Sequence, residues 1–496
     1  MTRSSLLHSP YVLSLLAGAL LCASYRLPGF WPLSFIALIP LLFAVRRAKT
    51  LTRSVQVGMI PGFCIAGIAT SWFFSVLPLP ESFGVTNSAI GFCFVLISWF
   101  LVTLVMALPF GLWTGALHYM RFTKAHEVAA MAILFVAAEY LRMVCFNILT
   151  LAPGEHNPVF FSVGAIGYAL ADSGSWRQFA SFGGIYFLSL VVVAVNLAFF
   201  CVLTARIGPV RNKILTGMIA ALLFWSVVPL AAVRAHLAPP PTGIASVAIM
   251  SLWSAAPDFA GERASYRAQE YEFIRKSSNA GASLIILPED TRGFQPFTVH
   301  TVGEYLAPGS AATVVDSGVF PLSPTIRTVR AFADTASSTT AVRDKQALTP
   351  QGEYLPMLFR LFLRVLGAQA QEEGFDTQHG LVTVSHVGTL VSAGPVRAGV
   401  LFCLEVLDPG LGSRLTQAGN GNLLAVPASH SWFVPSPSLE RDIVRFSQIQ
   451  AVEAGVPLAT SVARGPAFVL DAYGRIVVRI GIDQVSSWKV VTVPVR

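Results

Sequence analysis

The sequence predicts a polytopic α-helical membrane bundle that is followed by an α/β domain. Charged residues make up 12% of the 496 residues and hydrophobic residues 54%, whereas soluble domains average about 25% charged residues. The long apolar segments all lie before residue 234, and a proline-rich stretch separates them from a region of short apolar runs. The high hydrophobicity and low charge also exclude an intrinsically disordered chain.

Seven apolar segments are long enough for membrane-spanning helices, which need about 20 residues. They cover residues 8–24, 30–45, 55–78, 88–119, 127–150, 180–205 and 214–233. Because six further spans follow, the first segment is interpreted as a span rather than as a signal peptide. We therefore expect residues 1–233 to form a bundle of about seven transmembrane helices.

The distribution of basic residues predicts how this bundle is oriented. Residues 1–233 hold 13 of the 34 basic residues and 5 of the 26 acidic ones, so the whole net charge of +8 lies in the apolar part. With the N-terminus inside, ten of these basic residues fall in cytoplasmic loops, and only Arg26 and Arg177 fall in outer loops. This positive-inside pattern places the region after the seventh span on the extracytoplasmic face. It also argues against nucleic acid as a partner.

Residues 234–244 are predicted to form a linker, because Pro239, Pro240 and Pro241 favour a stiff, extended chain. The short apolar runs beyond it are bounded by glycine, proline and aspartate, which is typical of buried strands. The runs cover residues 245–250, 283–287, 381–385, 398–403, 422–426, 457–462, 467–470 and 475–480, and helical patterns cover 260–279 and 437–454. Residues 245–496 are therefore expected to form an extracytoplasmic α/β domain with its own core.

One of the six cysteines stands apart from the others. Cys22, Cys64, Cys93, Cys145 and Cys201 lie in predicted spans, where cysteine is usually a small buried hydrophobe. Cys403 is alone in the outer domain, where it is either an apolar filler or a reactive thiol. Its place at the end of an apolar strand, two residues before Glu405, favours the reactive thiol.

Three charged residues elsewhere in the outer domain offer partners for Cys403. Glu289 follows the apolar run 283–287 and a proline, and Lys345 and Glu353 lie eight residues apart in a turn-rich segment. Each of these residues taken singly is more typical of a solvated surface. Their joint occurrence in the order Glu, Lys, Glu, Cys favours a common site.

These residues resemble the nitrilase superfamily, whose catalytic set is Glu, Lys and Cys in this chain order. With the preceding spans, the whole chain resembles the bacterial apolipoprotein N-acyltransferases, as a divergent member. The block Lys345–Pro356, which contains Gly352-Glu353-Tyr354, is the most specific match. The other matching blocks are Trp31-Pro32, Glu139-Tyr140-Leu141-Arg142, Phe182–Ser189 with Asn196, Trp432-Phe433, Ala451–Leu458 and Asp471–Arg475.

The chain departs from the family pattern close to the catalytic set. Leu404 follows the cysteine where the family usually has an aromatic residue, and Ser429-His430-Ser431 replaces an Asn-Asp pair. Met250-Ser251-Leu252-Trp253 stands in place of a Gln-Gly-Asn run, and the family's final membrane span is missing. We expect the catalytic chemistry to carry over better than the lipid and acceptor specificity.

The resemblance implies a nitrilase-like αββα sandwich and a role for each residue of the site. Cys403 would form a thioester with the acyl group, and Glu289 would be the general base. Lys345 and the backbone N–H of Leu404 would stabilise the oxyanion. Glu353 and Glu405 would hold Lys345 and the substrate in position.

The resemblance also implies the reaction, the partners and the location. The acyl donor would be a phospholipid, and the acceptor would be the N-terminal amine of a diacylglyceryl-cysteine lipoprotein. No cofactor is implied, and the nine histidines show no spacing typical of a metal site. The expected location is the bacterial inner membrane, with the catalytic domain on the periplasmic side.

Three further pairs of residues are candidates for contacts with membrane or substrate, or for a role inside the bundle. Arg360 and Arg364 share one face of an otherwise apolar segment, which is either an interfacial helix or a core helix of the domain. Trp432 and Phe433 are candidates for substrate contact. Glu139 and Arg142 lie one turn apart in the fifth predicted span, where they are either functional or a pair that fixes the bundle.

Three other functions stay open on the sequence. A membrane-tethered carbon-nitrogen hydrolase or deacylase would use the same residues, with water as the acceptor. An inactive paralogue could serve as a scaffold. A transporter with an accessory domain is disfavoured, because the spans show no obvious internal repeat and few intramembrane charges.

Overall fold

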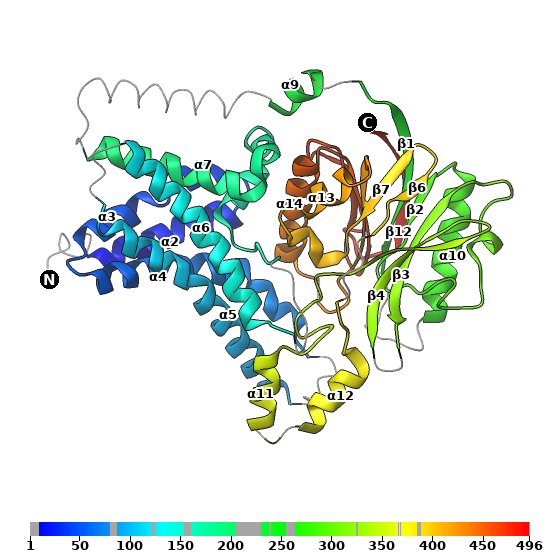
Figure 1. The fold of residues 1–496 in the computed structure, drawn as a ribbon, viewed down its shortest axis with the longest axis horizontal. Coiled ribbons are helices and arrows are strands. Elements are labelled where there is room, and N and C mark those ends of the chain that lie inside the picture. Colours follow the sequence, from blue (N-terminus) through cyan, green and yellow to red (C-terminus); the bar gives the residue numbers. More distant parts are fainter. Residues whose placement is uncertain are drawn as a thin grey trace. The chain divides into compact units, whose positions relative to one another are not determined.

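The computed structural model describes residues 9–79, 87–120, 125–152, 160–204, 230–237, 240–253, 263–323, 326–365, 367, 369–383, 388–433 and 435–495. The chain divides into two compact units, which are described separately (Figure 1). The helical unit comprises Met1–Phe74, Phe92–Leu149 and Phe161–Leu237, and the α/β unit comprises Ser75–Gly91, Thr150–Phe160 and Ala238–Arg496. The predicted two-part fold class is confirmed.

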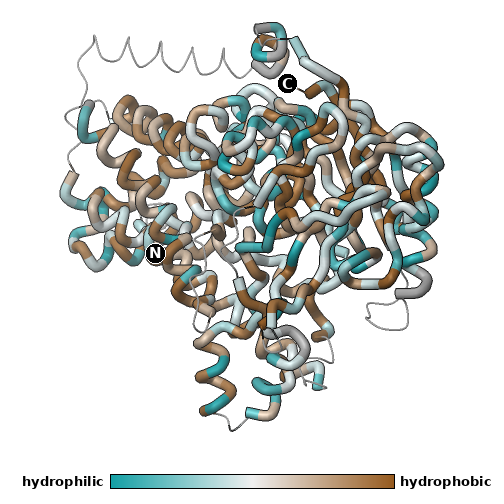
Figure 2. Tube along the Cα trace, turned by 45° about the vertical axis from the view of Figure 1, so that its right-hand side comes forward, coloured by the Kyte–Doolittle hydropathy of each residue, from teal (hydrophilic) through white to brown (hydrophobic). Residues whose placement is uncertain are grey.

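Among the residues described, four helical segments are long and apolar enough to cross a membrane, and all but the ends of two of them lie in the helical unit: Leu51–Val76, Ser88–Leu117, His126–Leu149 and Trp176–Leu203. Apolar residues run along most of the length of these helices (Figure 2). The α-helices of this unit are α2 (Pro10–Arg26), α3 (Ile39–Arg47), α4 (Leu51–Ala69), α5 (Ser88–Leu117), α6 (Ala125–Leu149), α7 (Ala180–Leu203) and α9 (Leu230–Leu237). Its short 3-10 helices are η1 (Trp31–Phe35), η2 (Ser71–Val76), η4 (Ile166–Asp172) and η5 (Trp176–Phe179). The expected span at 214–233 lies mostly outside the described residues.

The segment predicted as the second span is not one continuous helix. Residues 30–45 form η1 and the first part of α3, with an irregular stretch between them. The buried side chain of Asn196 on α7 fills this break, because its Nδ2 donates to the Ser34 carbonyl at 2.7 Å and its Oδ1 accepts from the Leu38 N–H at 2.8 Å. A polar side chain in an apolar bundle thus satisfies backbone groups that a helix would have satisfied itself.

The strands of the α/β unit form a sheet of twelve described strands. The strands are β1 (Gly243–Leu252), β2 (Leu284–Ile286), β3 (Thr313–Pro321), β4 (Arg327–Asp334), β5 (Thr339–Asp344), β6 (Val391–Ala393), β7 (Val396–Val400), β8 (Leu423–Ser429), β9 (Leu458–Ala463), β10 (Ala467–Leu470), β11 (Ile476–Ile480) and β12 (Ser487–Val495). Their order is β5-β4-β3-β2-β1-β9-β8-β7-β6, with β12 paired to β1 and the β10–β11 hairpin to β9. The run expected at 381–385 is irregular where it is described, and Leu381 donates its backbone N–H to the carbonyl of Glu353.

Alternation along β1 shows how this sheet is layered. Ala245, Val247 and Ile249 belong to a core that β2–β5 share with β6–β9, so the two halves of the sheet face each other. Met250 and Leu252 point the other way, into a second core with helix α10 (Arg263–Asn279). Helices α13 (Leu411–Gln417) and α14 (Pro437–Ala454) pack against β7–β9 (Figure 1). Two sheet layers between two helix layers make an αββα sandwich, as predicted.

Helix α14 spans the predicted residues, and its ends explain why. Ser436 caps the N-terminus by accepting from the Leu439 N–H, and Pro437 occupies the first position of the helix. Gly455 ends the helix with φ +70°, a left-handed conformation that suits glycine. Between the caps, Val444, Ile449 and Val452 are buried. The remaining helices of this unit are the short η6 (Val302–Glu304) and η7 (Cys403–Leu407), and the hairpin of α11 (Met357–Val365) and α12 (Gln369–His379).

Candidate active site

The predicted catalytic residues lie at one edge of the sandwich. Strands β2, β7 and β8 run in parallel ladders, and β5 has the same direction as β3 because two antiparallel pairings separate them. Glu289, Lys345 and Cys403 each follow the carboxyl end of one of these strands, β2, β5 and β7 respectively. The backbone N–H of Glu289 donates to the Ala428 carbonyl of β8 at 3.2 Å, which joins the two layers at this edge. The chain direction thus assembles residues that are far apart in the sequence.

The ammonium group of Lys345 lies between two carboxylates. Its Nζ donates to Oε1 of Glu289 at 2.9 Å and to Oε1 of Glu353 at 2.8 Å, and its side chain is only 1% exposed. The second oxygen of Glu353 accepts the Thr349 backbone N–H at 2.7 Å, which fixes the orientation of this carboxylate. The structure therefore brings together Glu289, Lys345 and Glu353, which are far apart or loosely spaced in the sequence.

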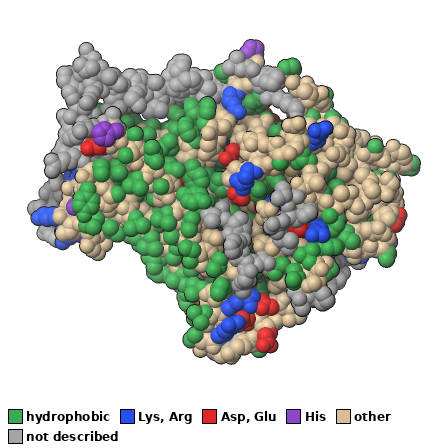
Figure 3. All heavy atoms as spheres, in the orientation of Figure 1, with side chains coloured by type: hydrophobic (Ala, Val, Ile, Leu, Met, Phe, Trp, Pro, Cys, Tyr) green, Lys and Arg blue, Asp and Glu red, His purple; other side chains and the backbone are tan. Residues whose placement is uncertain are grey.

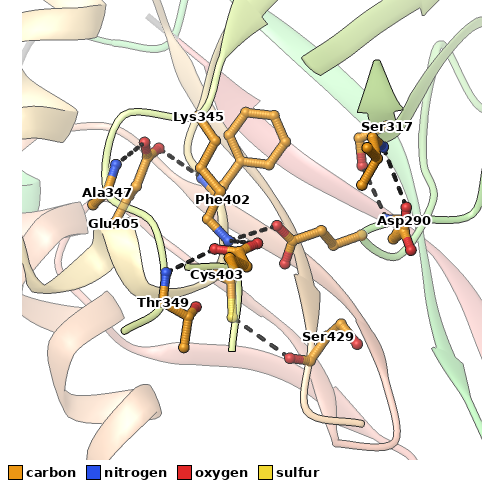
Figure 4. A network of polar contacts seen from close by, with 12 residues as sticks. Asp290, Ser317, Lys345, Ala347, Thr349, Phe402, Cys403, Glu405 and Ser429 are labelled. Carbon is orange, nitrogen blue, oxygen red and sulfur yellow. Dashed lines mark hydrogen bonds and ion pairs between the residues drawn. The ribbon is translucent and has the colours of Figure 1, made fainter. Parts of the chain in front are cut away.

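Cys403 begins the short helix η7 beside this triad (Figure 4). Its backbone has φ +33°, a strained value for a residue with a side chain. Its thiol is half-buried and donates to the Ser429 carbonyl at the end of β8, with 3.6 Å between sulfur and oxygen. Strain of this kind is concentrated at functional sites, which supports the interpretation of Cys403 as a reactive thiol.

Burial and charge shift the pKa values of all three groups. The pKa of the Cys403 thiol is raised to about 12, chiefly by burial and next by the charge of Glu289, with Lys345 acting in the opposite direction. Burial also raises the pKa of Glu289 to about 7, although Lys345 opposes this shift. Burial alone would lower the pKa of Lys345, but Glu289 and Glu353 raise it well above its usual value. The resting site thus combines a protonated thiol, a cationic lysine and a carboxyl group poised near neutral pH.

The carboxylate of Glu405 does not contact Lys345 directly in the described site. It forms an ion pair with Arg343, and it accepts backbone N–H groups from Gln346 at 2.7 Å and Phe402 at 2.9 Å. Sequence reasoning missed Arg343 and Ser429. Alternation along β5 could have indicated Arg343, because it lies two residues before Lys345 and so on the same face of the strand.

The loop after Glu289 is held by a buried aspartate. Asp316 on β3 accepts the backbone N–H groups of Gly293 at 2.9 Å and Phe294 at 3.1 Å, and it also accepts the Thr291 hydroxyl. Asp290, next to Glu289, has φ +64°, and its backbone N–H donates to the Ser317 hydroxyl oxygen of β3 at 3.4 Å. These bonds fix the direction in which Glu289 leaves β2.

The chain resembles proteins of one family along almost its whole length. The family model described as "Apolipoprotein N-acyltransferase N-terminal domain" matches residues 17–198. An apolipoprotein N-acyltransferase of Geobacter metallireducens is 24% identical over 94% of this chain and 86% of the relative. One of Pseudomonas syringae pv. tomato is 23% identical over 95% of this chain and 88% of the relative. The chain is therefore similar to the apolipoprotein N-acyltransferases along most of its length.

A solved structure also resembles this chain. It is a mutant of an amidase of the nitrilase superfamily from Nesterenkonia, at 16% sequence identity and a TM-score of 0.37. The match covers 52% of this chain and 94% of the amidase.

Among the described residues of the present protein, no three His, Cys, Asp or Glu side chains form a group that could hold a metal ion.

The other residues predicted to contact substrate or membrane lie near Cys403 and on helix α11. Trp432 and Phe433 are half-buried in the turn after Ser429, the residue that accepts the thiol hydrogen. Arg360 and Arg364 lie on α11 and pair with Glu372 of α12. These two arginines therefore pair with a neighbouring helix, and their contact with substrate or membrane stays a prediction.

Glu139 and Arg142 are both buried in the helical unit and bind the same irregular segment. Glu139 Oε1 accepts the Ile166 N–H at 2.8 Å, and Arg142 Nη1 donates to the Gly164 carbonyl at 2.6 Å. Gly164 needs its φ of +74°, and a Cβ there would lie 3.1 Å from Arg142 Nη1. Through these two hydrogen bonds, Glu139 and Arg142 attach η4 and the turn before it to α6, which agrees with a role in fixing the bundle.

Proposed function

We propose that this protein transfers a fatty acyl chain from a phospholipid, through a thioester on Cys403, to the N-terminal amine of a diacylglyceryl-cysteine lipoprotein. The observation that carries the proposal is the position of Lys345 between Glu289 and Glu353, beside a strained Cys403. The relatives named apolipoprotein N-acyltransferase support the transfer of an acyl group to the nitrogen of a lipoprotein.

The first half-reaction transfers the acyl group to sulfur. The Glu289 carboxylate takes the thiol proton while the sulfur of Cys403 attacks the ester carbonyl carbon of the phospholipid. Lys345 and the Leu404 N–H stabilise the oxyanion that forms. The carbon–oxygen ester bond then breaks, and the leaving lysophospholipid oxygen takes the proton from Glu289. The products are a lysophospholipid and the Cys403 thioester.

The second half-reaction returns the site to its starting state. Glu289 takes a proton from the α-amine of the acceptor as its nitrogen attacks the thioester carbonyl carbon. The carbon–sulfur bond breaks, and the Cys403 sulfur regains a proton from Glu289. Lys345 must stay charged to stabilise the oxyanion of both half-reactions. A buried ammonium group without partners would be unfavourable in the resting enzyme, which explains the two carboxylates beside it.

Intact-mass analysis of the purified protein in phospholipid micelles tests this proposal, with Cys403→Ala as the control. We expect an acyl-sized adduct on the wild type that neutral hydroxylamine releases and that the variant lacks. A diacylglyceryl-cysteine peptide should then take the acyl group as an amide. Discharge to water alone would support a hydrolase instead, and no adduct on a folded wild type would contradict the proposal.

A further inference from the structure

Three consecutive residues at the end of β5 contact different parts of the α/β unit. Lys345 lies in the catalytic set, and Arg343 points to the same side, toward β7. Asp344 points to the opposite side, where it forms a two-pronged ion pair with Arg330 of β4, at 2.6 Å and 2.9 Å. This alternation gives two buried ion pairs next to each other, of which only one faces the catalytic cysteine.

Arg343 connects the strand before Lys345 to the strand before Cys403. Its Nη1 donates to the carbonyl of Val400, the last residue of β7, at 3.0 Å. Nη1 and Nη2 also bind the two oxygens of Glu405. Arg343 is 2% exposed and Glu405 is fully buried, so solvent does not screen this pair.

The carboxylate of Glu405 connects the same two strands through backbone groups. Its Oε1 accepts the N–H groups of Gln346 at 2.7 Å and Ala347 at 3.3 Å, which directly follow Lys345. Its Oε2 accepts the N–H of Phe402 at 2.9 Å, which directly precedes Cys403 (Figure 4). The carboxylate therefore contacts the chain on the C-terminal side of Lys345 and on the N-terminal side of Cys403.

A buried carboxylate with these acceptor contacts needs a cation beside it. An isolated buried charge is strongly unfavourable, and breaking a buried pair by removing one partner leaves that cost uncompensated. Arginine fits this place because its planar fork binds both carboxylate oxygens in parallel and a carbonyl at the same time, a geometry that the single nitrogen of a lysine does not reproduce. Loss of Arg343 would therefore loosen the three backbone contacts of Glu405 as well as its own.

We propose that Arg343 is a positioning residue of the acyl-transfer site, which sets the spacing between Lys345 and Cys403 by holding Glu405. Arg343 contacts neither the thiol nor the ammonium group in the described site; it acts through Glu405 and Val400. The inference rests on the proposed function, because Arg343 is proposed to align an oxyanion-stabilising group, Lys345, with a nucleophile, Cys403. A misplacement of about 1 Å can cost about 10²-fold in rate.

The experiment compares Arg343→Met and Arg343→Lys with a matched control, Arg330→Met. Arg330→Met also removes the partner of a fully buried carboxylate, Asp344, but on the opposite side of β5. We would measure the rate of thioester formation on Cys403 at saturating phospholipid, the KM for phospholipid, and the midpoint of thermal unfolding. A second readout needs no substrate: the rate at which iodoacetamide modifies the Cys403 peptide, followed by mass spectrometry.

We expect Arg343→Met to lower the acylation rate about 10²-fold with little change in KM, and Arg343→Lys to recover part of the loss. Arg330→Met should lower the unfolding midpoint to a similar degree while leaving the acylation rate of the folded protein near that of the wild type. Equal losses of rate in Arg343→Met and Arg330→Met would overturn the proposal, because they would indicate a general loss of stability.

Measurements on a double variant and on the wild type distinguish a failure of the Arg343 proposal from a failure of the proposed function. If Arg343 acts through Glu405, Arg343→Met combined with Glu405→Gln should be no slower than the slower single variant. Additive losses would contradict a shared action. If the wild type forms no thioester, the proposed function fails, but the alkylation rates of Cys403 still decide whether Arg343 positions the thiol. Should Arg343→Met fail to fold, Arg343→Lys carries the same comparison.

Discussion

At the scale of single residues, Cys403 combines burial with the reactivity that the proposed acyl transfer requires. Its thiol pKa of about 12 means that almost no thiolate is present at neutral pH, whereas thiolate is the attacking form of cysteine. Proton removal must therefore accompany the attack. Glu289 has a pKa of about 7, which is close to the optimum for a general base that works at neutral pH. The two shifts belong together, because both come from burial at the same edge of the sheet.

The pKa of Glu289 predicts how acylation depends on pH. The carboxylate form is the base, so the rate of thioester formation should rise about tenfold per pH unit below pH 7 and level off above it. Glu289→Gln should lower the rate by about 10²- to 10⁴-fold and remove this step. Single-turnover mass spectrometry between pH 5.5 and 8.5 measures both. A wild-type profile that is flat across pH 7 would exclude Glu289 as the titrating base.

Through Glu289, the stability of the folded protein should fall as the pH rises, whereas the acylation rate should increase. Burial raises its pKa from 4.5 to about 7, so the folded protein binds this proton more tightly than the unfolded chain does. The stabilisation is fully present below pH 4.5 and is lost as the pH rises through 7. Glu289→Gln should therefore show a smaller fall in unfolding midpoint between pH 5 and 8 than the wild type. An unchanged fall would indicate that other groups dominate.

Sequence reasoning found the charged members of the site but not the residues that align them. Glu289, Lys345, Glu353 and Cys403 each follow a strand or lie in a distinctive turn, and such local patterns are visible in one sequence. Arg343 and Ser429 act through contacts with β7 and η7 that depend on strand order. Strand order arises from tertiary packing, which no local pattern reports.

At the scale of elements, strand β3, which the apolar runs of the sequence did not predict, contains residues that favour turns. β3 has Asp316-Ser317-Gly318 in its middle, which resembles a loop. In the structure Asp316 is buried because it caps the loop after Glu289, and a side chain on Gly318 would overlap Arg292. The break at residues 36–38 was missed for a similar reason: its compensation by Asn196 comes from a distant helix.

Helix α11 leaves one apolar face exposed. Its arginines are occupied by α12, because Arg360 pairs with Glu372 and Asp376, and Arg364 pairs with Glu372. The charged side chains of this hairpin cluster together in the space-filling view (Figure 3). The exposed apolar residues are Met357, Leu358, Leu361, Phe362 and Val365. We therefore retain the prediction of an interfacial helix, with its apolar face rather than its arginines in contact with lipid.

A charge introduced on this apolar face tests that prediction. Leu361 is 60% exposed, so Leu361→Glu should leave folding unchanged but weaken contact with a bilayer. We expect slower thioester formation with phospholipid vesicles, and an unchanged rate with a water-soluble short-chain ester. Val299→Glu is the matched control, because Val299 is an 85% exposed apolar residue outside α11. Equal losses in the two variants, or a loss with the soluble ester, would contradict an interfacial role.

At the scale of the whole molecule, the α/β unit is not one continuous stretch of chain. Residues Thr150–Phe160, which follow α6, belong to it. The Tyr354 hydroxyl donates to the Thr150 carbonyl, the Met357 N–H donates to the Leu151 carbonyl at 2.9 Å, and Ala152 lies in the core between the sheet layers. Tyr354 is the residue after Glu353, so this segment supports the turn that carries a partner of Lys345.

A fragment that begins at residue 238 should therefore be incomplete. Without residues 150–152, the Tyr354 hydroxyl and the Met357 N–H lose their partners, and a lost buried hydrogen bond costs about 1–3 kcal/mol. We expect faster hydrogen exchange at residues 348–357 in the fragment than in the full chain. Exchange in β8 and β9, which are distant in sequence from this segment, is the internal control. Equal protection of residues 348–357 in both proteins would show that the segment is dispensable.

The charge pattern of the helical unit makes a final prediction about topology. Ten basic residues fall in the loops on one side of the predicted spans, against two on the other, which favours a cytoplasmic N-terminus and a periplasmic α/β unit. Single cysteines in a cysteine-free chain test this. Val485 lies on the α/β unit and is well exposed, and Lys49 is exposed in the short connection between α3 and α4. A membrane-impermeant maleimide should label Val485→Cys in intact spheroplasts and Lys49→Cys only after permeabilisation. The reverse pattern would place the catalytic unit in the cytoplasm, and labelling of both positions in intact spheroplasts would mean that the number of spans between them is even.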